Sequence, residues 1–172
     1  MDIIIQNVTA DMKVNEEFDP VVSIMPSGAG ELDFTSSDVS VVTVNGIGTI
    51  TAVGDGLANV TVRFMGNDKY AAAESKNITV IVGLNDASVS VNNSTLDLVA
   101  DDTFTIIANT TPSGLNVTYI PDNSGVVSVD ENGTVTALKG GIATITFKVG
   151  GDGVYAENST TVTVTVSKIS TK

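Results

Sequence analysis

The chain has 172 residues and a formal net charge of −12, from 20 acidic and 8 basic side chains, with no Cys, His or Trp. This composition excludes disulfides, thiolate zinc sites and Ser-His-Asp catalysis, and the acidic balance argues against nucleic acid or an anionic membrane as a partner. No apolar run approaches the roughly 20 residues that span a bilayer, and no secretory leader is present, so we expect an exported protein to contain this chain as one part.

Period-two alternation predicts strands along most of the chain. In chain order, the clearest alternating runs are residues 58–64, 78–82, 143–149 and 162–166. Val and Thr dominate these runs, and both suit a pleated surface. Turn signals separate them at Asn45-Gly46, Gly54-Asp55-Gly56, Asn132-Gly133 and Gly150-Gly151-Asp152-Gly153. The pattern indicates an all-β protein; a β-sandwich is favoured, with a small barrel as the alternative.

The sequence is also a two-fold repeat. Val41-Val42-Thr43-Val44 aligns with Val126-Val127-Ser128-Val129, and Gly48-Thr49-Ile50-Thr51-Ala52-Val53 aligns with Gly133-Thr134-Val135-Thr136-Ala137-Leu138, both at an offset of 85. The offset drifts by one residue upstream and downstream, as expected from small changes in loop length. We therefore predict two tandem domains, residues 1–84 and 85–172, each able to fold alone.

The repeated motifs resemble those of bacterial immunoglobulin-like domains of group 2. The similarity rests on residues 33–44, on Gly48-Thr49-Ile50-Thr51-Ala52-Val53 and on Gly56-Leu57-Ala58-Asn59-Val60-Thr61-Val62. Phe34 and Tyr119 stand where that family usually has Trp, and copy two has Pro121-Asp122-Asn123-Ser124 in place of Ser-Ser-Asp. The resemblance implies two tandem immunoglobulin-like β-sandwich domains.

Such domains resemble the repeated modules of intimins, invasins and adhesin-like surface proteins, including those of methanogenic archaea. The resemblance implies a non-catalytic, extracellular cell-surface module that acts as a stalk or spacer for a recognition region in cell adhesion, with neighbouring repeats of the same chain as its partners. Two alternatives stay open. The module itself could bind a glycan or protein of a partner cell, or it could be an accessory domain of an extracellular carbohydrate-active enzyme. The sequence predicts no catalytic residues and no cofactor.

Nine Asn-x-Ser/Thr sequons are candidates for glycosylation, against about three expected by chance, although Thr-rich strands also create sequons through composition alone. Asn59 and Asn77 are predicted to lie on outward strand positions. The nine are Asn7, Asn59, Asn77, Asn92, Asn93, Asn109, Asn116, Asn132 and Asn158.

A calcium site at the domain junction is a second candidate, because hard cations prefer clustered carboxylate oxygens. The alternative is an acidic surface that only keeps the protein soluble. The candidate ligands are Glu16, Glu17, Asp55, Asn85, Asp86 and Asp152.

Two further sites come from the first copy. Lys13 and Asn77 are a candidate pair for an intramolecular amide crosslink between the first and last strands. The loop of residues 65–73 is a candidate ligand loop, since loops on a rigid sandwich often carry recognition. Its candidate residues are Met65, Asn67, Asp68, Lys69 and Tyr70. Because copy two repeats the tyrosine as Tyr155, a structural role is the alternative for Tyr70.

Overall fold

The computed structural model describes residues 1–171, and its regular elements there are all β-strands. The chain divides into two compact units, Met1–Asn85 and Asp86–Lys172. Within the described residues, no helix is long and apolar enough to cross a membrane. The fold is therefore all-β, as predicted.

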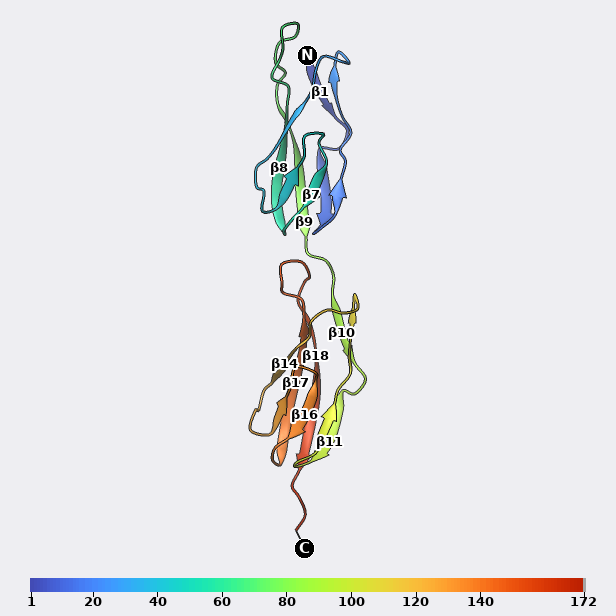
Figure 1. Ribbon diagram of the computed structural model, residues 1–172, viewed down its shortest axis with the longest axis vertical. Helices are drawn as coiled ribbons and strands as arrows, with labels where there is room; N and C mark the ends of the chain where they lie inside the picture. The colour runs from blue at the N-terminus through green and yellow to red at the C-terminus, as the bar shows by residue number, and fades with distance from the viewer. Residues whose placement is uncertain (172) are drawn as a thin grey trace. The chain divides into compact units, whose positions relative to one another are not determined.

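The first unit is a β-sandwich of two layers (Figure 1). One layer is a four-stranded sheet in the order β2-β9-β8-β5, and the other consists of the pair β1-β4 and the three-stranded sheet β3-β7-β6. The strands are β1 (Asp2–Ile5), β2 (Thr9–Lys13), β3 (Glu17–Phe18), β4 (Val22–Met25), β5 (Asp33–Ser36), β6 (Val42–Val44), β7 (Ile50–Ala52), β8 (Gly56–Arg63) and β9 (Lys76–Gly83).

The second unit repeats this arrangement strand for strand. Its layers are β11-β18-β17-β14 on one side and β10-β13 with β12-β16-β15 on the other. The strands are β10 (Ser88–Val91), β11 (Thr95–Val99), β12 (Thr103–Thr105), β13 (Ala108–Thr111), β14 (Thr118–Pro121), β15 (Val127–Val129), β16 (Thr134–Ala137), β17 (Gly141–Val149) and β18 (Asn158–Ser167). The two units are thus immunoglobulin-like sandwiches in tandem.

The cores follow from the alternation along the long strands. Each buried residue faces the opposite layer and its neighbours face solvent, because successive side chains of a strand point to opposite faces. In the first unit, Val60, Val62, Ile78 and Val80 have no exposed surface, whereas Ile81, the residue that breaks the alternation, is 48% exposed. In the second unit, the fully buried residues of β17 and β18 include Ile145, Phe147, Val162 and Val164.

The chain enters each unit at one end and leaves it at the opposite end. In the first unit, β2 runs parallel to β9, with Thr9 opposite Thr79 and Lys13 opposite Gly83. An ion pair of 2.8 Å joins Asp2 at the start of β1 to Lys76 at the start of β9, so the chain begins beside the start of its last strand. In the second unit, β11 runs parallel to β18 in the same way. Parallel pairing of an early strand with the last one separates the two ends of a domain.

Candidate functional site

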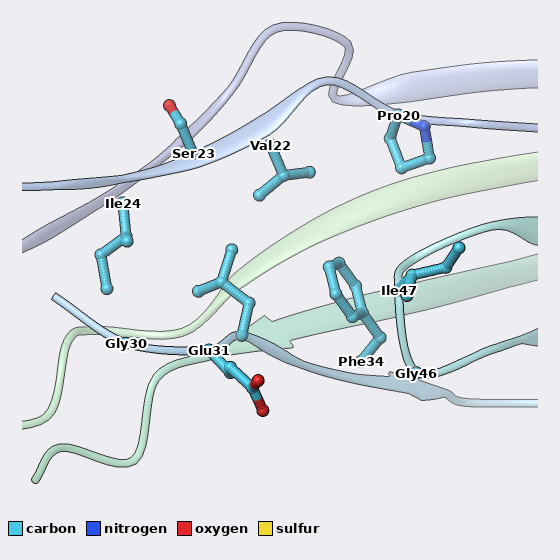
Figure 2. A pocket seen from close by; sticks show the side chains of 10 residues that line it. Pro20, Val22, Ser23, Ile24, Gly30, Glu31, Phe34, Gly46 and Ile47 are labelled. Carbon is cyan, nitrogen blue, oxygen red and sulfur yellow. The ribbon is translucent and has the colours of Figure 1, made fainter. Parts of the chain in front are cut away.

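An open depression of about 570 Å³ lies on the first unit. Its walls are β4 and the start of β5, and the turn between β6 and β7 closes one side (Figure 2). Most of its lining side chains are apolar and one is a carboxylate, while polar atoms form about as much of the exposed lining as apolar ones. The lining residues are Pro20, Val22, Ser23, Ile24, Gly30, Glu31, Leu32, Phe34, Gly46 and Ile47.

Phe34 lines this depression, and its ring lies close to a glycine. A Cβ atom added at Gly48 would lie 2.8 Å from the ring, and Gly48 has a φ of +98°. Copy two repeats the arrangement, since a Cβ at Gly133 would lie 3.3 Å from the hydroxyl of Tyr119. This aromatic–glycine contact explains why a glycine ends the equivalent turns Asn45–Gly48 and Asp130–Gly133 in both copies.

The aromatic residues of the two copies have different neighbours. Phe34 pairs in register with Val62, whereas Tyr119 pairs with Phe147. The rings of Tyr119 and Phe147 meet edge to face at 90°, with centroids 5.0 Å apart. A valine in place of the second ring gives Phe34 no such aromatic partner, so its half-buried ring contributes to the depression instead.

A second hollow of about 470 Å³ shares the Gly30–Leu32 segment with the first and reaches the predicted ligand loop. Asn67 organises that loop. Its Nδ2 donates to the carbonyl of Ala29 at 2.7 Å, and its Oδ1 accepts from the amides of Lys69 and Tyr70 at 3.0 and 2.9 Å. The Asn67 side chain therefore holds the loop in place and joins it to the preceding β4–β5 connection.

The other residues of this loop are more available. Met65 is 75% exposed, Asp68 and Lys69 are exposed, and the Lys69 ammonium lies 5.2 Å from the centre of the half-buried Tyr70 ring. Recognition by this loop stays a prediction.

The aspartate that follows Gly151 in copy two has the same role as Asn67. Oδ1 of Asp152 accepts from the amides of Val154 and Tyr155 at 3.0 and 2.8 Å, and these bonds lower its pKa below the ordinary value of 3.8. Tyr155 packs, half-buried, against the core of its unit. Residues 67 and 152 thus cap equivalent loops in the two copies.

The calcium prediction combines residues of both units and stays a prediction. Oε2 of Glu16 accepts from the amide of Lys13 at 2.7 Å, and Nδ2 of Asn85 donates to the carbonyl of Val14 at 3.0 Å. Glu17 and Asp55 are exposed, and Asp86 has an interaction partner. Across residues 1–171, no three acidic side chains are grouped closely enough to hold a metal ion.

The sequon asparagines differ in how freely their amides can react. Asn59 is half-buried, and its Oδ1 accepts from Thr79 Oγ1 at 3.0 Å. Three sequons meet on one sheet face, because Asn59 lies opposite Thr79 and Asn77 lies opposite Thr61, while Thr9 flanks Thr79 on the other side. The exposed sequon asparagines are Asn7, Asn77, Asn92, Asn93, Asn109, Asn116, Asn132 and Asn158.

The structure corrects one prediction, the crosslink between Lys13 and Asn77. In the parallel pair of β2 and β9, Lys13 lies opposite Gly83, six residues beyond Asn77. At about 3.3 Å per residue, the two positions are about 20 Å apart, too far for an amide bond. The Lys13 ammonium instead donates to the carbonyl of Leu84 at 2.7 Å. Sequence order placed both residues on the correct neighbouring strands but could not give their register.

With the geometry established, comparison with known proteins identifies the domain family. Residues 85–157 match the family model of the bacterial Ig-like domain (group 2). The second unit is a bacterial Ig-like domain of group 2. The first unit has the same strand order and the same aromatic–glycine contact. The expected family is confirmed by this match.

Solved structures to which the chain is similar include surface proteins and a cadherin. Domains 1–6 of the surface layer protein SbsC are 23% identical, with a TM-score of 0.37 over 90% of this chain and 23% of that one. Drosophila N-cadherin EC1-4 is 14% identical, with a TM-score of 0.41 over 99% and 50% of the two chains. BT4661, a SusE-like surface-located polysaccharide-binding protein from Bacteroides thetaiotaomicron, is 14% identical, with a TM-score of 0.36 over 98% and 35%.

No curated protein matches the chain significantly. The chain spans 23% of the length of the SbsC structure of domains 1–6 and 22% of that of rSbsC(31-844).

The sequence analysis missed the depression on the first unit. One signal was present: Ile47, an apolar residue in the Asn45–Gly48 turn, is 85% exposed at its rim. The other lining residues come from segments that are distant in sequence, so the sequence does not show that a gap remains beside Val22, Ile24 and Phe34.

Proposed function

We propose that this two-domain segment is a non-catalytic spacer of an extracellular cell-surface protein, which holds a recognition region for cell adhesion at a distance from the surface. The observation that carries the proposal is the path of the chain through each sandwich. Because β2–β9 and β11–β18 are parallel pairs, the chain enters each unit at one end and leaves at the opposite end. Repetition of such a unit adds length without returning the chain to its starting point.

Family membership and core structure support the same role. The second unit belongs to the bacterial Ig-like domains of group 2, and its buried core is formed by residues of that unit alone. The sequence contains no His or Cys for nucleophilic or general base catalysis of the usual kinds. Self-contained domains of this type can be added or removed without changing the fold of a neighbouring recognition domain.

The proposal is tested by replacing the segment in its parent protein with two unrelated immunoglobulin-like domains of the same length. A spacer predicts that cells carrying this replacement adhere as well as wild-type cells, whereas deletion of both domains reduces adhesion. If replacement abolishes adhesion as completely as deletion, the segment contributes specific contacts and the spacer role is wrong. A glycan array probed with the isolated chain, in calcium and in chelator, should show no saturable binding.

A further inference from the structure

The β4 strand of the first unit has one edge without a neighbouring strand. It pairs with β1 on one side only, as a two-stranded sheet. The sandwich layer continues as β3-β7-β6, but β7 pairs with β3 and begins only at Ile50, so it does not extend beside β4. One strand position beside β4 is therefore vacant, and the 570 Å³ depression lies along it.

The ladder register shows which backbone groups face this vacant position. The amide of Gln6 donates to the carbonyl of Val21 at 3.1 Å, so residues 6 and 21 form a hydrogen-bonded pair. Such pairs alternate with non-hydrogen-bonded pairs in an antiparallel ladder, which makes Val22 and Ile24 members of non-hydrogen-bonded pairs with Ile5 and Ile3. Their N–H and C=O groups point away from β1, and they have no hydrogen-bond partner within residues 1–171.

The vacant position also offers pockets for side chains. In Figure 2, Val22 and Ile24 point from β4 into the depression, and Ser23 points away from it. The Phe34 ring lies across from them, beside Ile47. A free backbone edge next to an apolar groove is the arrangement to which an extended peptide adds as a strand, with alternate side chains in the groove.

The charge of the surface selects the partner. Glu31 lines the depression, is exposed and forms no ion pair within the described chain. The whole chain carries a net charge of −12, so a second copy is repelled while a basic segment is attracted. We propose that the free edge of β4 binds an extended segment of a partner protein in which apolar residues alternate with Lys or Arg, added as a strand beside Val22 and Ile24.

The second unit has the same unpaired edge, since β13 pairs with β10 alone, but a polar residue stands in its apolar line, so it serves as an internal control for the apolar contacts. Thr110 of β13 stands where Ile24 stands in β4, two residues before the equivalent proline. Its hydroxyl accepts from the amide of Leu115 at 3.2 Å and donates to the carbonyl of Pro112 at 2.8 Å. These bonds tie the following loop back onto β13, and Leu115 packs against the core.

The first test is amide hydrogen exchange of the full chain, followed by NMR. In the free chain, the amides of Val22 and Ile24 should exchange faster than those of Ser23 and Met25, which face β1. Protection of Val22 and Ile24 in the free chain would overturn the proposal, because the edge would then be occupied.

The second test is titration with the acetylated, amidated octapeptide (Val-Lys)₄. The peptide should shift and protect the amides of Val22 and Ile24 and leave those of the second unit unchanged. The (Val-Glu)₄ peptide and a (Val-Lys)₄ peptide N-methylated at alternate residues should bind at least about fivefold more weakly, because the first is repelled and the second cannot donate to the edge. No response of Val22 and Ile24 to (Val-Lys)₄ would refute the strand-addition site.

Matched variants assign the effect to this surface. Glu31→Lys and Ile47→Ser change exposed residues of the depression and should each weaken (Val-Lys)₄ binding at least about fivefold, the first by charge and the second by loss of apolar contact. Glu131→Lys, on the second unit, and Val39→Ser, at a residue that is 68% exposed and does not line the depression, should have little effect. Equal losses in Glu31→Lys and Glu131→Lys would show non-specific charge attraction and overturn the proposed site. Concentration-dependent dimerisation through the β4 edge would show that a second copy, not a basic partner, occupies it.

Discussion

Replacement of Phe147 by Leu tests whether one aromatic pair carries a large part of the second unit's stability. Phe147 has no exposed surface and meets the Tyr119 ring edge to face at 5.0 Å. The change removes three buried carbons, at about 0.8 kcal/mol each. Loss of the edge-to-face contact adds about 0.5–1.5 kcal/mol. The expected decrease in the free energy of unfolding is therefore about 3–4 kcal/mol.

That decrease is a large share of the total free energy of unfolding of such a domain. At about 0.05–0.15 kcal/mol per residue, a unit of this size has an unfolding free energy of about 4–13 kcal/mol. The first unit has its own core and should keep its stability. Unfolding in urea, followed residue by residue in ¹H–¹⁵N NMR spectra, measures the two units separately.

The control is Phe104→Leu in the same unit, since Phe104 is 37% exposed and the change should cost about 1 kcal/mol or less. If Phe147→Leu costs no more than Phe104→Leu, the attribution of stability to the buried ring is wrong. If both units lose stability equally, their cores are not independent.

Three further outcomes are expected. Gly48→Ala should destabilise the first unit by about 1–3 kcal/mol in thermal or urea unfolding, because the new methyl group would clash with the Phe34 ring and because Gly48 has a positive φ. The control Gly114→Ala should cost less, because Gly114 has a φ of +82° but open space around it. The stability of the second unit should fall as the pH drops from about 4 through the lowered pKa of Asp152, and Asp152→Asn should reduce this fall in acid unfolding curves. Asn67→Ala should increase amide exchange throughout residues 65–73 while leaving the β8 amides protected; unchanged exchange in the loop would show that its three hydrogen bonds do not hold it.

The sequence by itself determined the fold class and the repeated unit. Alternation in residues 58–64 and 143–149 assigns one face to the core because a strand has a side-chain period of two, and nothing distant can alter that local geometry. The aligned motifs likewise indicated equivalent turns in both copies, and Gly48 and Gly133 indeed lie beneath equivalent aromatic rings. These properties depend on neighbouring residues and on repetition.

Only the tertiary structure determined the register of the paired strands and the unpaired edge of β4. Parallel pairing places Lys13 opposite Gly83 and not near Asn77, because a register is set by which side chains pack together across strands. The gap beside β4 likewise depends on where β7 begins and on Val62, which stands in place of a second aromatic ring. Whether another strand meets the backbone groups of Val22 and Ile24 depends on segments far away in the chain.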